Sequence, residues 1–306
     1  MSKQTAQKRI EQVADQVIEM LEKEGTQWSK PWVKAIGTDG LPINALTGNC
    51  YQGFNTFNLM FKSWEVGFEK PIWATFNQWK SLGATIVKGQ KATPIIYFDI
   101  KTRTVESTTN ADSETVTFPL LKSFNVFNLS QVEFQTASDK LIFTDEIETT
   151  SDNNKFFNLN AEKIISDSLA EIKFVKGDKA FYSPAQDMIV LPEQQQFNDE
   201  SRFYGVALHE LIHWTGSKTR LARDFKRFGS NAYAFEELIA ELGSAMLCGY
   251  CQIDSVPRAD HAQYINSWLR VLKNDKKQVI KACSKSFEAV NYLIELSNKT
   301  ALDRAA

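Results

Sequence analysis

The segment GVALHELIHWTG, at residues 205–216, constrains the fold of this chain more than any other stretch. It carries His209 and His213, two of the three histidines in the sequence. Because an α-helix turns about once every 3.6 residues, histidines four apart project from one face of a helix, one above the other. Glu210 directly follows the first histidine. This His-Glu-x-x-His pattern is typical of a metal-binding helix whose glutamate acts as a general base.

A second helix is expected to complete the metal site. Residues 230–249 are strongly helical and carry Glu237 and Glu241 among small and apolar side chains. Like charges four residues apart repel by about 0.2–0.5 kcal/mol even when exposed, so a cation or a proton is expected between them. We assign Glu237 as the third ligand and Glu241 as the acceptor that orients a ligand histidine, although these two roles could be exchanged. Glu236 is then expected to point away.

Two histidines and one carboxylate leave a fourth position for water, as in catalytic zinc sites. We therefore predict a zinc centre with Glu210 as the catalytic base of peptide hydrolysis. The strand-like residues 182–191 are expected to run along the cleft and pair with an extended substrate. Tyr233, Arg220 and Arg223 are candidate donors to a tetrahedral intermediate. The alternative is a zinc ion that only holds its domain together.

The first third of the chain is basic and aromatic, although the formal net charge of the whole chain is -2. Residues 28–104 contain nine lysines and arginines against four acidic residues, and five of the seven tryptophans. Interleaved rings and cations suit single-stranded nucleic acid, because bases stack on the rings and phosphates follow the cations. The alternative is that each of these tryptophans belongs to the core.

The chain of 306 residues is long enough for two domains that each bury a core of their own. The N-terminus is charged along its length and no run of 18 apolar residues follows, so we expect neither a signal peptide nor a membrane span. We expect a cytoplasmic protein whose four cysteines are thiols. Cys248 and Cys251 are interpreted as buried thiols at a helix end.

Periodicity predicts an α+β fold in both domains. The first domain has helices followed by strands, and the second is mostly helical with a small sheet. Polar residues mark a linker between them. The predicted bounds are 1–135, 136–155 and 156–306. Helices are expected at 2–24, 55–66, 75–82, 160–169 and beyond 199, and strands near 85–88, 93–99, 118–134, 172–174, 180–182 and 187–191.

Several motifs, in order along nearly the whole chain, are similar to those of ArdC-type antirestriction proteins. The first domain carries WSKPW (28–32), LPINALTGNCYQGFN (41–55), PIWATFNQW (71–79), KGQKATP (88–94) and FNVFN (124–128). The second carries YSP (182–184), HELIHWTG (209–216), RFG (227–229) and YAFEELIAELG (233–243). The accessory region of conjugative plasmid primases is similar as well. A histidine that family members often carry near Ser217 is missing here.

The resemblance implies a single-stranded DNA-binding domain joined to a zincin-like metallopeptidase domain. Such proteins belong to plasmids and other mobile elements and protect incoming DNA from host restriction. The alternative is an active endopeptidase that cleaves a host restriction enzyme or another host protein, with the first domain only localising it. The residues expected to contact DNA are Trp28, Trp32, Tyr51, Trp73, Trp79, Lys80, Lys88 and Lys91.

Overall fold

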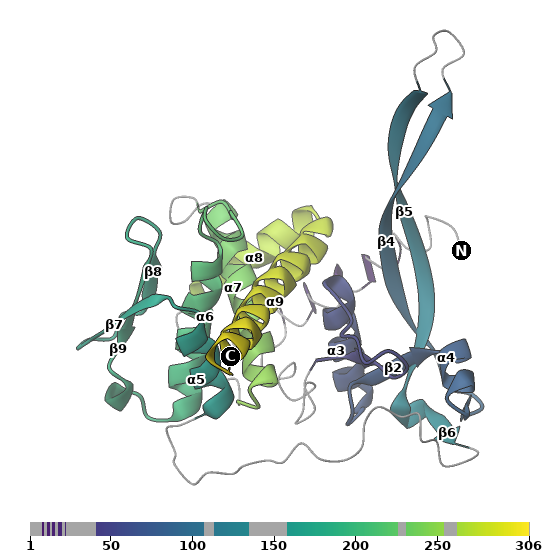
Figure 1. The fold of residues 1–306 in the computed structure, drawn as a ribbon, viewed down its shortest axis with the longest axis horizontal. Helices are drawn as coiled ribbons and strands as arrows, with labels where there is room; N and C mark the ends of the chain where they lie inside the picture. The colour runs from purple at the N-terminus through teal and green to yellow at the C-terminus, as the bar shows by residue number, and fades with distance from the viewer. Residues whose placement is uncertain are drawn as a thin grey trace.

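The structure, a computed structural model, describes residues 41–106, 113–134, 158–225, 231–253 and 262–305, together with single residues between positions 8 and 22. It places an N-terminal α+β part beside a mostly helical C-terminal part (Figure 1). The predicted linker, Trp28 and Trp32 lie outside the described residues. The described helices include none that is both long and apolar enough to span a bilayer.

The N-terminal part is built on a four-stranded sheet in the order β1-β2-β5-β4. The edge strand β4 and its neighbour β5 form one long antiparallel hairpin that rises from the body (Figure 1). A small two-stranded sheet pairs β3 with β6, so β3 and β4 are neighbours in sequence but not in a sheet. The bounds are β1 Ile43–Asn44, α3 Phe54–Val66, β2 Ile72–Thr75, α4 Phe76–Ser81, β3 Ala84–Ile86, β4 Thr93–Glu106, β5 Ser113–Asn128, η2 Leu129–Gln131 and β6 Val132–Phe134.

Helix α3 covers the open edge of β4 through asparagine side chains. Asn55 donates to the carbonyl of Ile96 at 2.7 Å and accepts from its N–H at 2.8 Å. Asn58 donates to the carbonyl of Pro94 at 2.7 Å. An uncovered edge strand would present these groups to other chains, and a proline is tolerated at such an edge because its missing N–H costs no ladder bond.

The C-terminal part packs four long helices beside a three-stranded sheet in the order β7-β9-β8. Strand β7 is parallel to β9, and β8 is antiparallel to it. Asp199 caps α6 by accepting from the N–H of Arg202 at 2.9 Å, as an N-terminal aspartate does. The bounds are α5 Leu159–Asp167, β7 Glu171–Val175, β8 Phe181–Ser183, β9 Met188–Pro192, η3 Gln194–Gln196, α6 Glu200–Thr215, α7 Asn231–Tyr250, α8 Ala262–Asn274 and α9 Lys277–Ala305.

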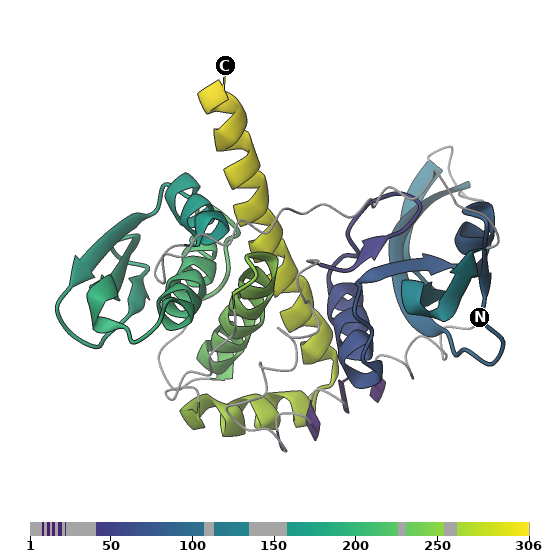
Figure 2. The same ribbon diagram turned by 90° about the horizontal axis from the view of Figure 1, so that it is seen from below.

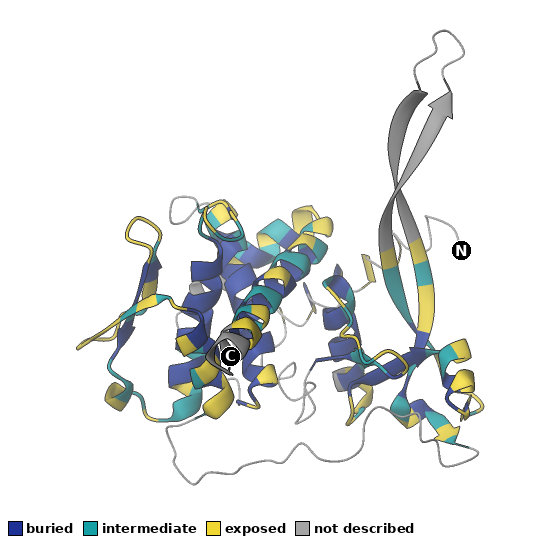
Figure 3. Ribbon diagram, viewed as in Figure 1, coloured by how far each residue is buried: buried dark blue, intermediate teal, exposed yellow. Residues whose placement is uncertain are grey.

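One hydrophobic cluster spans both parts, and the N-terminal part also has two smaller buried clusters of its own, which contain Trp79 and Trp73. Phe57 and Met60 of α3 belong to the same buried cluster as the helices of the C-terminal part. Helix α9 runs between α3 and α7 and contacts both (Figure 2). Gly53, at φ 56°, enters α3 where an added Cβ would lie 3.4 Å from the hydroxyl oxygen of Ser284 on α9. The α+β fold class is confirmed, and much of α6 and α7 is buried (Figure 3).

Candidate functional site

Helices α6 and α7 bring together the three side chains expected to bind metal. Nε2 of His209 lies 3.5 Å from Oε2 of Glu237, and Nε2 of His213 lies 3.6 Å from Oε1 of the same carboxylate. One donor atom from each residue can be chosen so that all lie within 4.8 Å of one another. A tetrahedral ion with bonds of about 2.0–2.1 Å holds its donors roughly 3.3 Å apart, so the set fits one small divalent cation.

Each histidine has an acidic partner behind it. Nδ1 of His209 lies 3.5 Å from Oε2 of Glu241, and Nδ1 of His213 lies 3.2 Å from Oε1 of Glu236. This geometry favours Glu237 over Glu241 as the ligand, because Glu237 alone of the three acids faces both Nε2 atoms. The expectation that Glu236 points away is wrong. Glu236 is buried against His213 because α6 crosses α7 there, which helical periodicity along one helix does not predict.

Arg223 holds Glu236 in place from the far side. Its Nε and one terminal nitrogen lie 3.0 and 2.9 Å from the two carboxylate oxygens. The same guanidinium donates to the carbonyl of Ile212 at 2.6 Å and to the hydroxyl of Thr215 at 2.8 Å, near the end of α6. Arg223 therefore lies behind His213, where its guanidinium is bound to Glu236 and to the end of α6. The expectation that it donates to a reaction intermediate is wrong.

The buried acids set the protonation of the histidine between them. Burial by itself would lower the pKa of His213, but hydrogen bonds and charges from Glu236 and Glu237 outweigh it and raise that pKa to about 10. Burial would likewise raise the pKa of Glu237, yet both histidines hold it well below its usual range. A metal ion and a proton therefore compete for Nε2 of His213.

Glu210 is buried next to the candidate ligands, and strand β8 holds its carboxylate. Its Oε2 accepts from the backbone N–H of Tyr182 at 2.9 Å. Residues 182–191, expected to run as one edge along the cleft, include both β8, which lies at the edge of its sheet, and β9, which lies at its centre. Arg220, the second candidate donor, binds the carboxylate of Asp187 and donates to the carbonyl of Trp214 at 2.7 Å, so it ties the β8–β9 turn to α6.

The residues expected to contact DNA divide into buried rings and exposed cations. Trp73 and Trp79 are 0% exposed, and Trp79 donates from Nε1 to the carbonyl of Phe127 at 2.9 Å. A buried ring presents no face to a base, so these two tryptophans are core residues and are removed from the DNA-contacting set. Tyr51 is half-buried, and its hydroxyl donates to the carbonyl of Trp73 at 3.2 Å. Lys80, Lys88 and Lys91 are exposed.

Among the side chains of this part that the structure describes, three further aromatic rings are exposed, and none of them was among the expected DNA contacts. Phe76 is 54% exposed, Tyr97 is 49% exposed and Phe124 is 43% exposed. The tryptophans that the sequence indicated as stacking residues, Trp73 and Trp79, are buried. Strand alternation could have identified Tyr97 and Phe124, because it places every second side chain of β4 and β5 on the same face.

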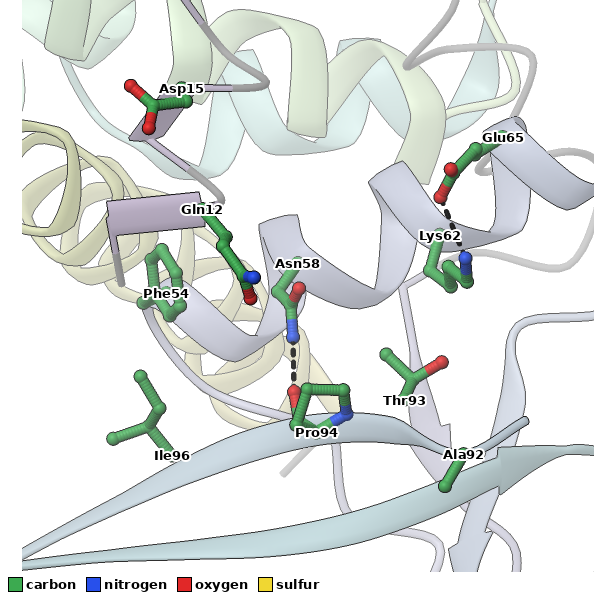
Figure 4. Close-up of a pocket in the computed structure, with 10 residues that line it drawn as sticks. All are labelled: Gln12, Asp15, Phe54, Asn58, Lys62, Glu65, Ala92, Thr93, Pro94 and Ile96. Carbon is green, nitrogen blue, oxygen red and sulfur yellow. Dashed lines mark hydrogen bonds and ion pairs between the residues drawn. The ribbon is translucent and has the colours of Figure 1, made fainter. Parts of the chain in front are cut away.

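A cleft of about 450 Å³ opens between the N-terminal helical residues, α3 and the start of β4 (Figure 4). Its charged residues are already paired. Lys62 lies 2.8 Å from Glu65, and Asp15 lies 2.6 Å from Lys276. With two carboxylates and one lysine among its lining residues, this cleft does not favour a phosphate.

Comparisons with known proteins agree with this architecture. Residues 7–127 match the family described as the N-terminal domain of anti-restriction factor ArdC. The metal-free crystal structure of the antirestriction ArdC protein from plasmid R388 is 30% identical in sequence, with 95% of this chain and 98% of that chain covered at a TM-score of 0.76. The chain belongs to the ArdC family. Residues 159–285, which contain all the candidate ligands, match the zincin-like metallopeptidase family.

A second structure of the R388 protein and two further proteins are also similar over nearly the whole of this chain. The Mn(II)-bound structure of the R388 ArdC protein is 30% identical, covers 94% of this chain and 97% of that chain, and has a TM-score of 0.70. An uncharacterised Sinorhizobium fredii protein, y4eC, is 30% identical over 95% of this chain and 92% of its own length. The DNA primase TraC of Escherichia coli is 34% identical over 94% of this chain, but the chain spans only 27% of that primase.

Proposed function

We propose that this protein protects incoming plasmid DNA from host restriction by binding single-stranded DNA non-specifically through its N-terminal part. The observation that carries the proposal is the full-length similarity to the ArdC protein of plasmid R388, which is an antirestriction protein. The exposed lysines of the N-terminal part support it, because cations along a surface bind phosphates and release counterions.

We further propose that the C-terminal part binds zinc through His209, His213 and Glu237. Two imidazoles and one carboxylate are a common ligand set for zinc in proteins, and the donor separations fit its tetrahedral coordination. The R388 relative has a Mn(II)-bound structure, so manganese is the natural competitor in a metal-binding experiment. Glu241 and Glu236 would orient the two rings by accepting from Nδ1–H.

The alternative function is an active zinc endopeptidase that cleaves a host protein. The observation that favours it is Glu210, buried beside the ligands and held by the N–H of Tyr182. Zinc, when bound, would polarise a peptide carbonyl and acidify a water molecule. Glu210 would accept the proton of that water and pass it to the leaving amine. The backbone bond to Tyr182 would keep its carboxylate oriented during the transfer.

A DNA-binding titration tests the first proposal. Single-stranded and double-stranded DNA of equal length are compared over a salt series. We expect preference for the single strand and an affinity that falls as salt rises, with a slope of about -0.7 for each phosphate contacted. Equal affinity for both DNAs, or an affinity that does not respond to salt, would remove the basis of the proposal.

The variant Glu210→Gln separates the two functions. It keeps the metal ligands but removes the proton acceptor, so metal uptake should be unchanged. If DNA binding is the mechanism, cells that carry the variant protect a transferred plasmid from restriction as well as wild type does. If hydrolysis is the mechanism, protection is lost. The variant Lys299→Gln, at an exposed lysine of α9 far along the chain from both sites, is a matched control.

A further inference from the structure

We propose that Tyr97 and Phe124, on the base of the β4–β5 hairpin, form a platform on which bases of single-stranded DNA stack, with Lys122 as an adjoining phosphate contact. This inference rests on the proposed DNA binding. It moves the stacking role from the buried tryptophans to two rings that solvent reaches.

The register of the hairpin places these side chains on one face. Tyr97 pairs with Lys122, and Ile95 pairs with Phe124. Directly opposed residues of an antiparallel pair share a face, and so do residues two apart along a strand. All four side chains therefore project from the same side. Two residues beyond Ile95 and Phe124, toward the body, the same face carries the buried pair Thr93 and Val126.

The two rings are arranged so that bases can reach them. Their centroids lie 6.1 Å apart at an interplanar angle of 82°. In such an edge-to-face pair one ring directs its edge at the other, so each ring keeps at least one face that its partner does not cover. At 49% and 43% exposure, both rings also keep much of their surface in solvent. Cross-strand contact between the rings stabilises the hairpin, and that contact does not require either ring to be half exposed.

The charge around the platform identifies the partner as a polyanion. Residues 71–97 and 122–128 form β2, α4, β3, the start of β4 and the end of β5. These two segments contain four lysines and no acidic residue. All four lysines, Lys80, Lys88, Lys91 and Lys122, are exposed. Exposed rings beside exposed lysines are the composition by which proteins bind single strands without reading sequence.

Phe76, at the start of α4, is a third exposed ring of the N-terminal part. It directly follows Thr75, whose register partner Val126 is two residues from Phe124. At 54% exposure it is the most exposed ring of the group. A strand that passes the platform could therefore meet a third ring at the start of α4, and its removal should cause a smaller loss than removal of the paired rings.

The test compares ring variants on two DNAs. Fluorescence anisotropy measures binding of oligothymidylate of about 20 nucleotides, long enough to exceed a single binding site, and of an abasic strand of equal length. The variants are Tyr97→Ala, Phe124→Ala, Tyr97→Leu, which keeps apolar bulk without a ring, and Tyr97→Phe, which keeps the ring. Phe174→Leu, at a 52% exposed ring on β7 in the C-terminal part, is the matched control.

We expect Tyr97→Ala, Tyr97→Leu and Phe124→Ala each to weaken oligothymidylate binding by roughly 5- to 150-fold, the range measured for one base stacked on one ring. Tyr97→Phe and Phe174→Leu should bind as wild type does. On the abasic strand the Tyr97→Ala loss should nearly vanish, because that strand offers no base to stack. Lys122→Gln should reduce the salt slope by about 0.7 on both strands.

The outcomes distinguish the platform from the function on which it rests. If wild-type protein does not bind single-stranded DNA, the proposed function and the platform both fail, and this is visible before any variant is measured. If wild type binds but Tyr97→Leu binds equally well, the ring faces are not used and the platform alone is overturned. An equal Tyr97→Ala loss on the abasic strand would also overturn it, since the loss would not depend on bases.

Discussion

At the scale of single residues, Glu236 connects the candidate metal site to the stability of the fold. It accepts from Arg223 and faces Nδ1 of His213, and all three side chains are buried. Replacing Glu236 with Ala leaves a buried guanidinium without its carboxylate, which costs about 3–5 kcal/mol. It also frees the ligand ring to turn, which costs roughly 10- to 100-fold in metal affinity. Denaturant unfolding and zinc titration measure the two effects.

The matched variant Glu236→Gln keeps an acceptor oxygen while it removes the charge. We expect it to recover much of the metal affinity and less of the stability, because the arginine still lacks its counter-charge. An unchanged zinc affinity in Glu236→Ala would contradict the assigned positioning of His213.

Proton competition at His213 is a second prediction at this scale. With its pKa raised to about 10, chiefly by Glu236 and Glu237 against the effect of burial, the ring carries a proton at neutral pH until metal displaces it. Zinc affinity should therefore rise with pH, by roughly tenfold per pH unit for each proton released, up to about pH 10. Calorimetric titration in buffers of different ionisation enthalpy counts the protons. Binding without proton release at pH 7 would contradict the prediction.

At the scale of elements, the helices that could be predicted from the sequence are those whose ends are marked by capping residues. Helix α3 ends at Gly67, whose φ of 79° suits glycine, and α4 begins after Thr75, which accepts from Gln78 in a capping box. Sheet pairing was not predictable in the same way. Strand β3 pairs with β6, about 48 residues away, and such partners are chosen by packing. The burial of Trp73 and the inward position of Glu236 depend on tertiary contacts for the same reason.

The covered edge of β4 gives a prediction for an element. Asn55 makes two hydrogen bonds to the backbone of Ile96. In Asn55→Ala both backbone groups lose their partner, and we expect a loss of about 1–3 kcal/mol in the free energy of unfolding. Hydrogen exchange at the Ile96 amide should accelerate. Asn55→Asp keeps the acceptor but sets a carboxylate against a carbonyl, so it should protect the amide while still lowering stability. Unchanged exchange in Asn55→Ala would show that the edge is covered by other contacts.

At the scale of the whole molecule, the hydrophobic cluster that joins the two parts predicts one cooperative unit. Helix α9 packs against α3 on one side and against the ligand helix α7 on the other, and buried residues of all three belong to one cluster. Calorimetry should therefore give a single unfolding transition. Saturating zinc, at about 100 times its Kd, should stabilise that whole transition by roughly 2.7 kcal/mol.

Phe57→Ala, which opens a cavity in α3 far in sequence from the candidate ligands, should lower the free energy of the same transition by about 3–5 kcal/mol and leave zinc affinity unchanged. Two transitions, of which zinc moves one and Phe57→Ala moves the other, would mean that the parts fold independently despite their contact. A single transition that both perturbations move would mean that metal bound at α6 and α7 adds to the stability of the surface that we propose binds DNA.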